Sequence, residues 1–324
     1  MSLLEVEGLT VKIRTEGGEL TIVDDVDYAV QQGQVFGVAG ESGSGKTISV
    51  LALLQLLPRG ASTSGSAMYA GRDLLRLSGR ALRGVRGREL AMIFQDPLTS
   101  LHPMMTIGRQ LSEHVRVHEG ASKRVALARA ADLLAEVRLP DPERALQAFP
   151  HQFSGGMRQR VAIAGALATR PKLLIADEPT TALDVTVQAG ILRLLDRLRR
   201  ESGLSVILIT HDLGVLSSIA DHASIFYAGR IVESGTTREL LTAPRHPYTR
   251  ALLDALPHPD EEDRIELQAI PGLPPSPRNR PSGCAFHPRC AYASDESRKH
   301  QPPLVPVSDT RLLACHVDPF APRS

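Results

Sequence analysis

The chain has 324 residues, and its 37 Lys and Arg against 36 Asp and Glu leave a net charge of +1 at neutral pH. This length suits one large α/β domain with a smaller addition. Balanced charge gives no electrostatic argument for a nucleic-acid partner. No apolar run approaches the roughly 20 residues that cross a bilayer, and residues 1–5 do not begin as a signal peptide does. We therefore expect a cytosolic protein that reaches a membrane only through a partner.

The segment 40–47, GESGSGKT, fits the pattern G-x-x-x-x-G-K-[ST] of a phosphate-binding loop. The apolar run 35–39 before it predicts a buried strand, and residues 48–57 predict a helix, a context that a chance Gly- and Ser-rich turn lacks. Lys46 would reach the β- and γ-phosphates of a nucleoside triphosphate, and the Thr47 hydroxyl would bind Mg²⁺. The other phosphate-binding positions are Gly40, Ser42, Gly43, Ser44 and Gly45.

Strands and a helical block are predicted around this loop. The expected short strands are 3–13, 26–30, 66–69 and 90–94. Six arginines between residues 72 and 88 indicate either a patch facing anions or, as we favour, an amphipathic helix with a solvated face. Residues 101–148 read as helices and predict a helical insertion at about 97–168. Asp141 is expected to cap one of these helices, with Pro142 as its first residue.

Further polar groups follow predicted secondary structure at points where α/β folds bind ligands. Ser154 precedes two glycines and is predicted to cap a helix, which creates a second anion site at a helix N-terminus. The apolar strand that begins at Lys172 ends on Asp177 and Glu178, so that one acid can hold Mg²⁺ while the other polarises a water. The strand 205–210 ends at His211. Each feature alone is common; their combination suggests nucleotide chemistry.

The C-terminal part changes in composition from residue 257 onward. Before it, Thr236 and Glu239 fit a capping box, and residues 246–256 predict a helix. After it, the proline-rich segment 271–277 reads as a linker. All three cysteines of the chain lie in the last fifth, at Cys284, Cys290 and Cys315. An odd set of cysteines argues against a disulfide framework and raises the question of a metal.

Together, these segments resemble the ATP-binding subunit of an ATP-binding-cassette (ABC) transporter over about residues 3–256. The matching motifs, in chain order, are Walker A at 40–47, the Q-loop glutamine Gln95, the signature at 154–157, Walker B at 177–178, the D-loop at 182–184 and the switch histidine His211. The resemblance implies a P-loop NTPase fold of the ABC type, an α/β fold with an antiparallel β subdomain and a helical insertion. It also implies ATPase activity.

The resemblance further implies roles for these residues. ATP and Mg²⁺ would be bound, with Thr47, Gln95 and Asp177 near the metal. Glu178 would be the general base for the attacking water, and His211 would stabilise the γ-phosphate side. Two ATPase subunits would pair head to tail, so that the signature residues Ser154, Gly155 and Gly156 contact ATP held by the partner. Closure on ATP and opening after hydrolysis would drive the membrane subunits.

Details of the sequence are similar to the oligopeptide/dipeptide importer branch of this family. The similar segments are 41–45, 96–101, 153–160, 246–249, 283–290 and 314–316. Phe153 and Met157 indicate the D-type subunit, which forms a heterodimer with an F-type ATPase. Its implied partners are two transmembrane permease subunits and, through the complex, an extracytoplasmic peptide-binding protein, with no nucleic acid. We expect an ATP-binding domain at 1–256 and an irregular extension at 257–324, peripheral on the cytoplasmic face of the cell membrane.

The chain departs from its relatives at two places. Relatives stack an aromatic ring on adenine from the end of the first strand, where this chain has Ile13 and Arg14, and Tyr28 is expected to face the core instead. Relatives also have four cysteines in the tail and can carry a [4Fe–4S] cluster.

The expected third of these four cysteines is Ser297 here. Because such clusters normally have four cysteine ligands, a cluster on Cys284, Cys290 and Cys315 would need a substitute ligand such as His287, His316 or Ser297. The alternative is three reduced thiols.

Two other functions remain open at this level. A soluble ABC ATPase acting on DNA or ribosomes is disfavoured by the near-neutral charge and by the lack of coiled-coil insertions, zinc modules or a second cassette. A catalytically silent regulatory ATPase is disfavoured because Glu178 and His211 are both present. The sequence does not name the cargo: dipeptides, longer peptides, glutathione and some sugars are all compatible with it.

Overall fold

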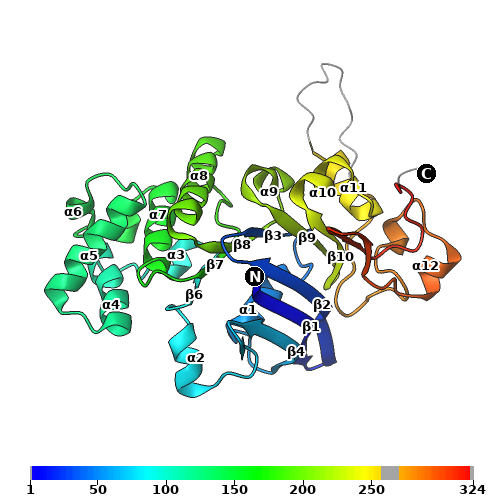
Figure 1. Ribbon diagram of the computed structural model, residues 1–324, viewed down its shortest axis with the longest axis horizontal. Coiled ribbons are helices and arrows are strands. Elements are labelled where there is room, and N and C mark those ends of the chain that lie inside the picture. The colour runs from blue at the N-terminus through cyan, green and yellow to red at the C-terminus, as the bar shows by residue number, and fades with distance from the viewer. Residues whose placement is uncertain (1, 257–269, 322–324) are drawn as a thin grey trace, which may run out of the picture. The chain divides into compact units, whose positions relative to one another are not determined.

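The computed structural model describes residues 2–256 and 270–321 (Figure 1). These residues divide into two compact units. The first unit holds residues 31–35 and 76–209. The second unit holds residues 2–30, 36–75 and the described residues from Thr210 onward.

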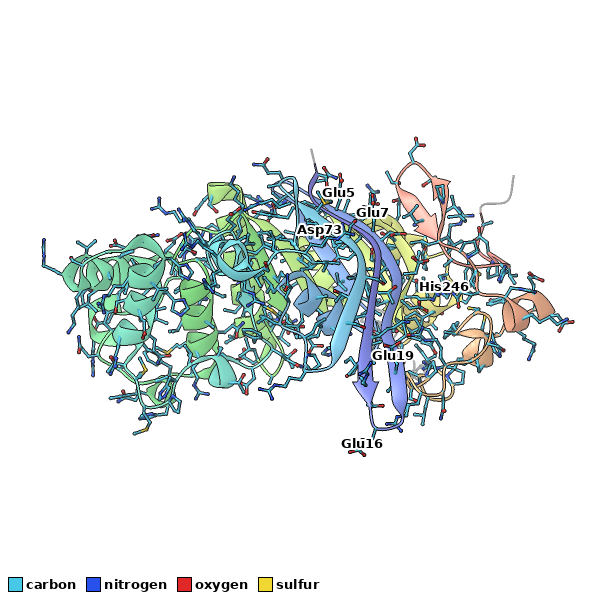
Figure 2. The ribbon with its side chains drawn as sticks, turned by 90° about the horizontal axis from the view of Figure 1, so that it is seen from below. Glu5, Glu7, Glu16, Glu19, Asp73 and His246 are labelled. Carbon is cyan, nitrogen blue, oxygen red and sulfur yellow. The ribbon has the colours of Figure 1, made fainter. Side chains whose placement is uncertain are left out.

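The second unit contains a four-stranded antiparallel sheet in the order β2-β1-β4-β5. Its strands are β1 (Ser2–Thr15), β2 (Gly18–Gln31, whose last residue belongs to the first unit), β4 (Ala61–Tyr69) and β5 (Arg72–Asp73). Glu5 and Glu7 lie at the opposite end of the β1–β2 hairpin from Glu16, which is in the turn, and Glu19, which follows it (Figure 2). Strands β1 and β2 are longer than the sequence pattern predicted.

A bulge in β1 explains why the polarity pattern of this strand changes phase. The register shifts by one residue between Glu7 and Thr10. Buried positions are accordingly even-numbered before the bulge, at Leu4 and Val6, and odd-numbered after it, at Leu9 and Val11. An extra residue in one strand re-aims the side chains that follow it. Both hydrophobic stretches of β1 can therefore face one core.

The rest of the second unit is built on strands that hold the predicted phosphate-binding loop. Strand β3 (Val35–Ala39) runs parallel to β9 (His222–Tyr227), and β10 (Arg230–Thr236) is antiparallel to β9. The helices are α1 (Lys46–Leu53), α9 (Leu213–Ile219), α10 (Thr237–Thr242), α11 (Pro247–Asp254) and α12 (Asp295–Lys299), with a 3₁₀ turn at His287–Arg289. Thr236 and Glu239 form the predicted capping box of α10.

The C-terminal extension contains more regular structure than its composition indicated. Strand β12 (Arg311–Leu313) pairs antiparallel with β10, and β11 (Val305–Ser308) pairs with β12 (Figure 1). A three-residue strand is too short to show a period of two in the sequence. These strands add the extension to the edge of the sheet in the second unit.

The first unit combines parallel strands with helices. Strand β7 (Leu173–Asp177) pairs in parallel with β6 (Leu90–Ile93) on one side and with β8 (Ser205–Thr210) on the other. The helices are α2 (Gly79–Val85), α3 (Pro97–Ser100), α4 (Ile107–Glu119), α5 (Lys123–Glu136), α6 (Pro142–Ala145), α7 (Gly155–Ala166) and α8 (Val185–Ser202), with a 3₁₀ turn at Pro150–Gln152. All regular structure within 97–168 is helical, and α4, α5 and α6 group together (Figure 1).

Two local expectations were wrong. The arginine-rich segment forms a helix only over Gly79–Val85, because it begins as strand β5 and its chain turns extended again at Arg86. Asp141 does not cap α6: its φ of 47° is left-handed and its side chain makes no capping hydrogen bond, although Pro142 does begin the helix. Among the described residues, no helix is long and apolar enough to span a membrane.

A buried histidine at the start of α11 makes the stability of the second unit depend on pH. The His246 side chain accepts a hydrogen bond from the Tyr248 N–H at 3.0 Å, and burial lowers the pKa of His246 to about 3. In the unfolded chain its pKa is about 6.5. The unfolded state therefore binds an additional proton between these values, so stability falls as pH falls from about 6.5 towards 3.

We expect His246 to cost the native state about 2 kcal/mol at pH 5 relative to pH 7. His246→Asn retains a capping oxygen but does not titrate, so the variant should lose about 2 kcal/mol less than the parent over this pH step. Urea unfolding of both proteins at pH 7 and pH 5 measures the difference. Glu233 is present in both proteins, so its contribution to the pH dependence of stability cancels in the difference between parent and variant. Equal losses in parent and variant would show that His246 is not the titrating group.

Candidate active site

The phosphate-binding loop connects β3 to α1 in the second unit. Gly40, Gly43 and Gly45 have φ of 145°, 77° and 100°, which are accessible to glycine at little cost. A Cβ atom at Gly40 would lie 2.1 Å from the Phe226 carbonyl oxygen, so the loop passes directly against β9. The loop ends at the first residue of a helix, Lys46. Backbone N–H groups at such a position bind anions.

Lys46 is buried at the centre of this loop. Its side chain donates hydrogen bonds to the carbonyl oxygens of Gly40 at 2.8 Å and Glu41 at 2.9 Å, with 5% of the residue exposed. The ammonium group thus lies inside the ring that the loop forms. A glycine-lined ring closed by a cation is a chemical fit for phosphate oxygens.

The first unit brings together Gln95 and Glu178. The Gln95 Nε2 donates a hydrogen bond to Glu178 Oε2 at 2.8 Å, and Thr181 Oγ1 donates to the same oxygen at 2.9 Å. Glu178 directly follows β7 and has a φ of 46°, a left-handed conformation that costs a non-glycine residue roughly 1 kcal/mol. Its N–H donates to the Ile209 carbonyl at 2.9 Å. Gln95 and Thr181 therefore hold the Glu178 carboxylate, and the bond to Ile209 of β8 holds the backbone of Glu178 at the end of the strand.

Asp177 is the last residue of β7 and is 3% exposed. Its carboxylate, like the Gln95 side-chain amide and the Thr47 hydroxyl, offers a hard oxygen donor of the type that Mg²⁺ prefers. Asp177 and Gln95 belong to the first unit, and Thr47 belongs to the second. Their chemistry fits the metal predicted with ATP.

The signature glycines begin α7 in the first unit. Ser154 caps the helix by accepting a hydrogen bond from the Met157 N–H at 3.3 Å, as predicted. A Cβ atom at Gly156 would lie 2.4 Å from Val187 Cγ1, and one at Gly155 would lie 3.2 Å from Leu183 Cδ2. The glycines thus allow α7 to approach the D-loop and α8 closely. Ser154 and Gly155 are exposed, whereas Gly156 is buried.

His211 follows β8 directly and is exposed, in the second unit with the phosphate-binding loop. Its neighbour Asp212 caps α9 by accepting a hydrogen bond from the Gly214 N–H at 2.7 Å. This cap holds the backbone on one side of His211, and the end of the strand holds it on the other.

Strand β1, where the resemblance implied an aromatic ring against adenine, carries no aromatic residue. Tyr28 is 7% exposed and stacks on Phe36 with ring centroids 5.3 Å apart, so it faces the core as predicted. Its burial raises the pKa of the Tyr28 hydroxyl. Ile13 is half-buried and Arg14 is exposed on β1.

The three cysteines border one small cavity in the second unit. Its lining includes Cys284, Cys290, Cys315, His287, Ser297 and His316. The substitute ligands proposed from the sequence already have partners: His287 Nδ1 lies 3.0 Å from the Cys284 carbonyl, His316 Nε2 lies 2.9 Å from the His300 carbonyl, and Ser297 Oγ lies 3.0 Å from Ser294 Oγ.

The fit to a metal cluster is poor in this arrangement. Within residues 2–256 and 270–321, no three His, Cys, Asp or Glu side chains converge where they could hold a metal ion. Burial raises the pKa of Cys284 to about 11 and also raises that of Cys290, so these two side chains are thiols at neutral pH. The donor set present here does not match the four thiolates that a [4Fe–4S] cluster normally requires.

Sequence reasoning missed two side chains that contact the phosphate-binding loop. Arg289, from the extension, forms an ion pair with Glu41, and the Tyr248 hydroxyl accepts a hydrogen bond from the Glu41 N–H. Both lie more than 200 positions along the chain from Glu41. No local pattern marks either contact, although Glu41 itself stands in the motif.

Four features together define a nucleotide-binding domain of the ABC class. They are a glycine-lined loop before a helix, paired acids at the end of a buried strand, a Q-loop amide that is hydrogen-bonded to the second acid, and a helix that begins with glycines and is capped by a serine. The chain matches the family model described as ABC transporter over residues 23–181. It also matches the model described as the oligopeptide/dipeptide transporter C-terminal region over residues 232–296.

Curated relatives match over nearly the full length. The chain is 48% identical over 313 residues to the oligopeptide transport ATP-binding protein OppD of Bacillus subtilis, covering 96% of this chain and 87% of that protein. It is 47% identical over 317 residues to the dipeptide transport ATP-binding protein DppD of Escherichia coli, covering 98% and 97%.

A solved structure agrees with the fold. The dimeric ATP-binding cassette MJ0796 in a post-hydrolysis state, bound to ADP and Pi, is 26% identical with a TM-score of 0.65, covering 72% of this chain and 99% of that one. The chain belongs to the ABC transporter ATP-binding subunits, in the branch that includes the oligopeptide and dipeptide transport proteins.

Proposed function

We propose that this chain is the ATP-hydrolysing subunit that energises the import of di- and oligopeptides by an ABC transporter. The observation that carries the proposal is the near-full-length similarity to the oligopeptide and dipeptide transport ATP-binding proteins, which extends through the C-terminal region. A soluble ABC ATPase without a transporter is not favoured, because residues 232–296, beyond the match to the general ABC model, match the oligopeptide/dipeptide transporter model.

The second unit supplies groups that would bind the nucleotide. Lys46, which donates to the carbonyl oxygens of Gly40 and Glu41, would reach the β- and γ-phosphate oxygens from inside the loop. The remaining phosphate contacts come from backbone N–H groups of residues 40–47. His211 would lie on the γ-phosphate side.

The first unit supplies the groups that act on the attacking water. Glu178 would accept its proton, and Gln95 orients the Glu178 carboxylate through the 2.8 Å hydrogen bond. Mg²⁺ would supply charge neutralisation for the phosphates, and the residues that would hold it are Asp177, Thr47 and Gln95. Ser154 and Gly156 would serve ATP bound to a second subunit, because Ser154 caps a helix N-terminus at which Ser154 and Gly155 are exposed.

The proposed assembly follows from membership of this branch. Two ATPase subunits pair, this chain being the D-type member and an F-type subunit its partner. Two transmembrane permease subunits and an extracytoplasmic peptide-binding protein complete the transporter, and the chain lies peripherally on the cytoplasmic face of the membrane. The ATP-binding domain is 1–256 with its helical insertion at about 97–168, and residues 257–324 form the extension.

A [4Fe–4S] cluster has no place in this proposal. The proposed cofactor set is ATP with Mg²⁺, and the three cysteines are assigned as reduced thiols because the described side chains offer no converging ligand set. Iron and acid-labile sulfide assays on anaerobically purified protein should find neither. Stoichiometric iron and sulfide would overturn this assignment.

Gentle affinity purification from membranes, followed by mass spectrometry, tests the transport function. We expect a second, different ATPase and two multi-spanning proteins to be recovered with this chain. Recovery of the chain alone, from the soluble fraction of the same cells, would refute the importer assignment. A homologous ATPase without permeases would refute it equally.

A further inference from the structure

Arg289, carried by the cysteine-containing extension, reaches the phosphate-binding loop. Its guanidinium pairs with both carboxylate oxygens of Glu41, with Nη1 to Oε2 at 2.7 Å and Nη2 to Oε1 at 3.0 Å. Its Nε donates to the Pro271 carbonyl at 2.9 Å, and Nη1 lies 3.3 Å from the Tyr227 hydroxyl. Only 5% of the Arg289 side chain is exposed. A bidentate pair of this kind fixes orientation as well as distance.

Glu41 joins this pair to the lysine that binds phosphate. Its carbonyl oxygen accepts a hydrogen bond from Lys46 Nζ at 2.9 Å, while its N–H donates to the Tyr248 hydroxyl at 2.8 Å. The side chain, the N–H and the carbonyl of one loop residue are thus all engaged. Two of these three contacts come from outside the loop. They leave the peptide groups on either side of Glu41 little freedom to rotate.

An aromatic cluster supports the two outside groups. The ring centroids of Tyr227 and Tyr248 are 4.5 Å apart, and Phe286 of the extension lies 5.2 Å and 5.3 Å from them. Each of these rings is at most 2% exposed. The Arg289 guanidinium lies 5.8 Å from the Tyr227 ring centroid and 6.0 Å from that of Phe286. The positions of Arg289 and Tyr248 are therefore set by close packing.

We propose that Arg289 and Tyr248 are positioning residues for the phosphate-binding loop, which makes the C-terminal extension part of the ATP site. They act through Glu41 and do not touch the nucleotide. The inference rests on the proposed function in one respect only, that the loop binds ATP. It adds that the loop is pre-organised for phosphate by a residue nearly 250 positions away.

A purely structural role for Arg289 makes a different prediction. The ion pair would then only attach the extension, and its loss would lower stability without changing the loop. The Arg245–Asp318 pair provides a matched control, because it also links the core of the second unit to the extension. Neither of these residues is in contact with residues 40–47 in any described hydrogen bond or ion pair.

The test compares Arg289→Gln, Asp318→Asn and the parent by binding of a fluorescent ATP analogue with Mg²⁺ and by thermal midpoint without nucleotide. We expect Arg289→Gln to raise the Kd by at least about tenfold, whereas Asp318→Asn stays within about twofold despite a comparable loss of thermal stability. Arg289→Lys should recover only part of the affinity, because an ammonium cannot form the bidentate pair. An unchanged Kd in Arg289→Gln, or equal rises in both variants, would overturn the proposal.

A double-mutant cycle with Glu41→Gln shows whether Arg289 acts through Glu41. The Kd of the double variant should be no higher than that of the weaker-binding single variant. Multiplicative effects would contradict the assigned route. If Arg289→Gln does not fold, Tyr248→Phe removes only one hydroxyl and should raise the Kd by about threefold, and a parental Kd would then overturn the proposal. Failure of the parent to bind ATP would refute the proposed function instead.

Discussion

Glu178→Gln is expected to lower the rate of ATP hydrolysis by about 10²–10⁴-fold while the affinity for ATP stays within a few-fold of the parent. The amide has the shape of the carboxylate and can still accept the hydrogen bond that Gln95 Nε2 donates at 2.8 Å. It cannot take a proton from water at neutral pH. Phosphate release measures turnover, and binding of a fluorescent ATP analogue measures affinity.

Glu201→Gln is the matched control for this substitution. It makes the same chemical change at an exposed residue of α8, where Glu201 pairs with Arg197 at 3.3 Å. Because exposed pairs contribute little, both turnover and affinity should remain at the parental level. Hydrolysis at the parental rate in Glu178→Gln would refute the assigned base. A fall in affinity as large as the fall in turnover would show damage to the site instead.

Gly40→Ala should abolish ATP binding and destabilise the protein by about 3 kcal/mol or more, since it combines backbone strain with a steric clash. The added Cβ would lie 2.1 Å from the Phe226 carbonyl oxygen. This oxygen belongs to β9, which is parallel to β3, so it cannot withdraw without disturbing the pairing of the two strands. The φ of 145° at Gly40 is also unfavourable for alanine. Thermal unfolding and nucleotide binding measure the two effects.

Gly43→Ala separates strain from clash within the same loop. Gly43 has a φ of 77°, but beyond its two neighbours in the chain no atom lies within 4 Å of the position that a Cβ would occupy. The expected cost is therefore only about 1 kcal/mol, from the left-handed backbone. Equal losses of stability in the two variants would show that contact between the loop and β9 is not what makes glycine necessary at position 40.

Local patterns predicted the elements that carry the site. The buried strands 35–39 and 205–210 occur where their continuous apolar runs indicated, and Ser154 caps α7 as its residue type suggests. These features depend on neighbouring residues, so a sequence displays them directly. Asp141 shows the limit, because its left-handed conformation removed the cap that its residue type favours.

Contacts between distant segments were not predictable in this way. The ABC resemblance gave both Gln95 and Glu178 a role at the ATP site. Only the structure shows the hydrogen bond between them. The Arg289–Glu41 pair had no such guide. Arg289 stands between a proline and a cysteine, and the sequence interpretation of this segment considered only its cysteines, as cluster ligands or as reduced thiols. Its actual contacts are with a carboxylate, a carbonyl and two aromatic rings.

The order in which a ribosome makes this chain gives the Arg289–Glu41 contact a consequence for biosynthesis. Glu41 is translated 248 residues before Arg289. At the usual rates of about 5–20 residues per second, this interval lasts roughly 10–50 s. Throughout it, the nascent polypeptide carries a Walker A segment whose glutamate has no arginine partner. A chain released early, by a premature stop codon at or before position 289, would never acquire the arginine partner of Glu41.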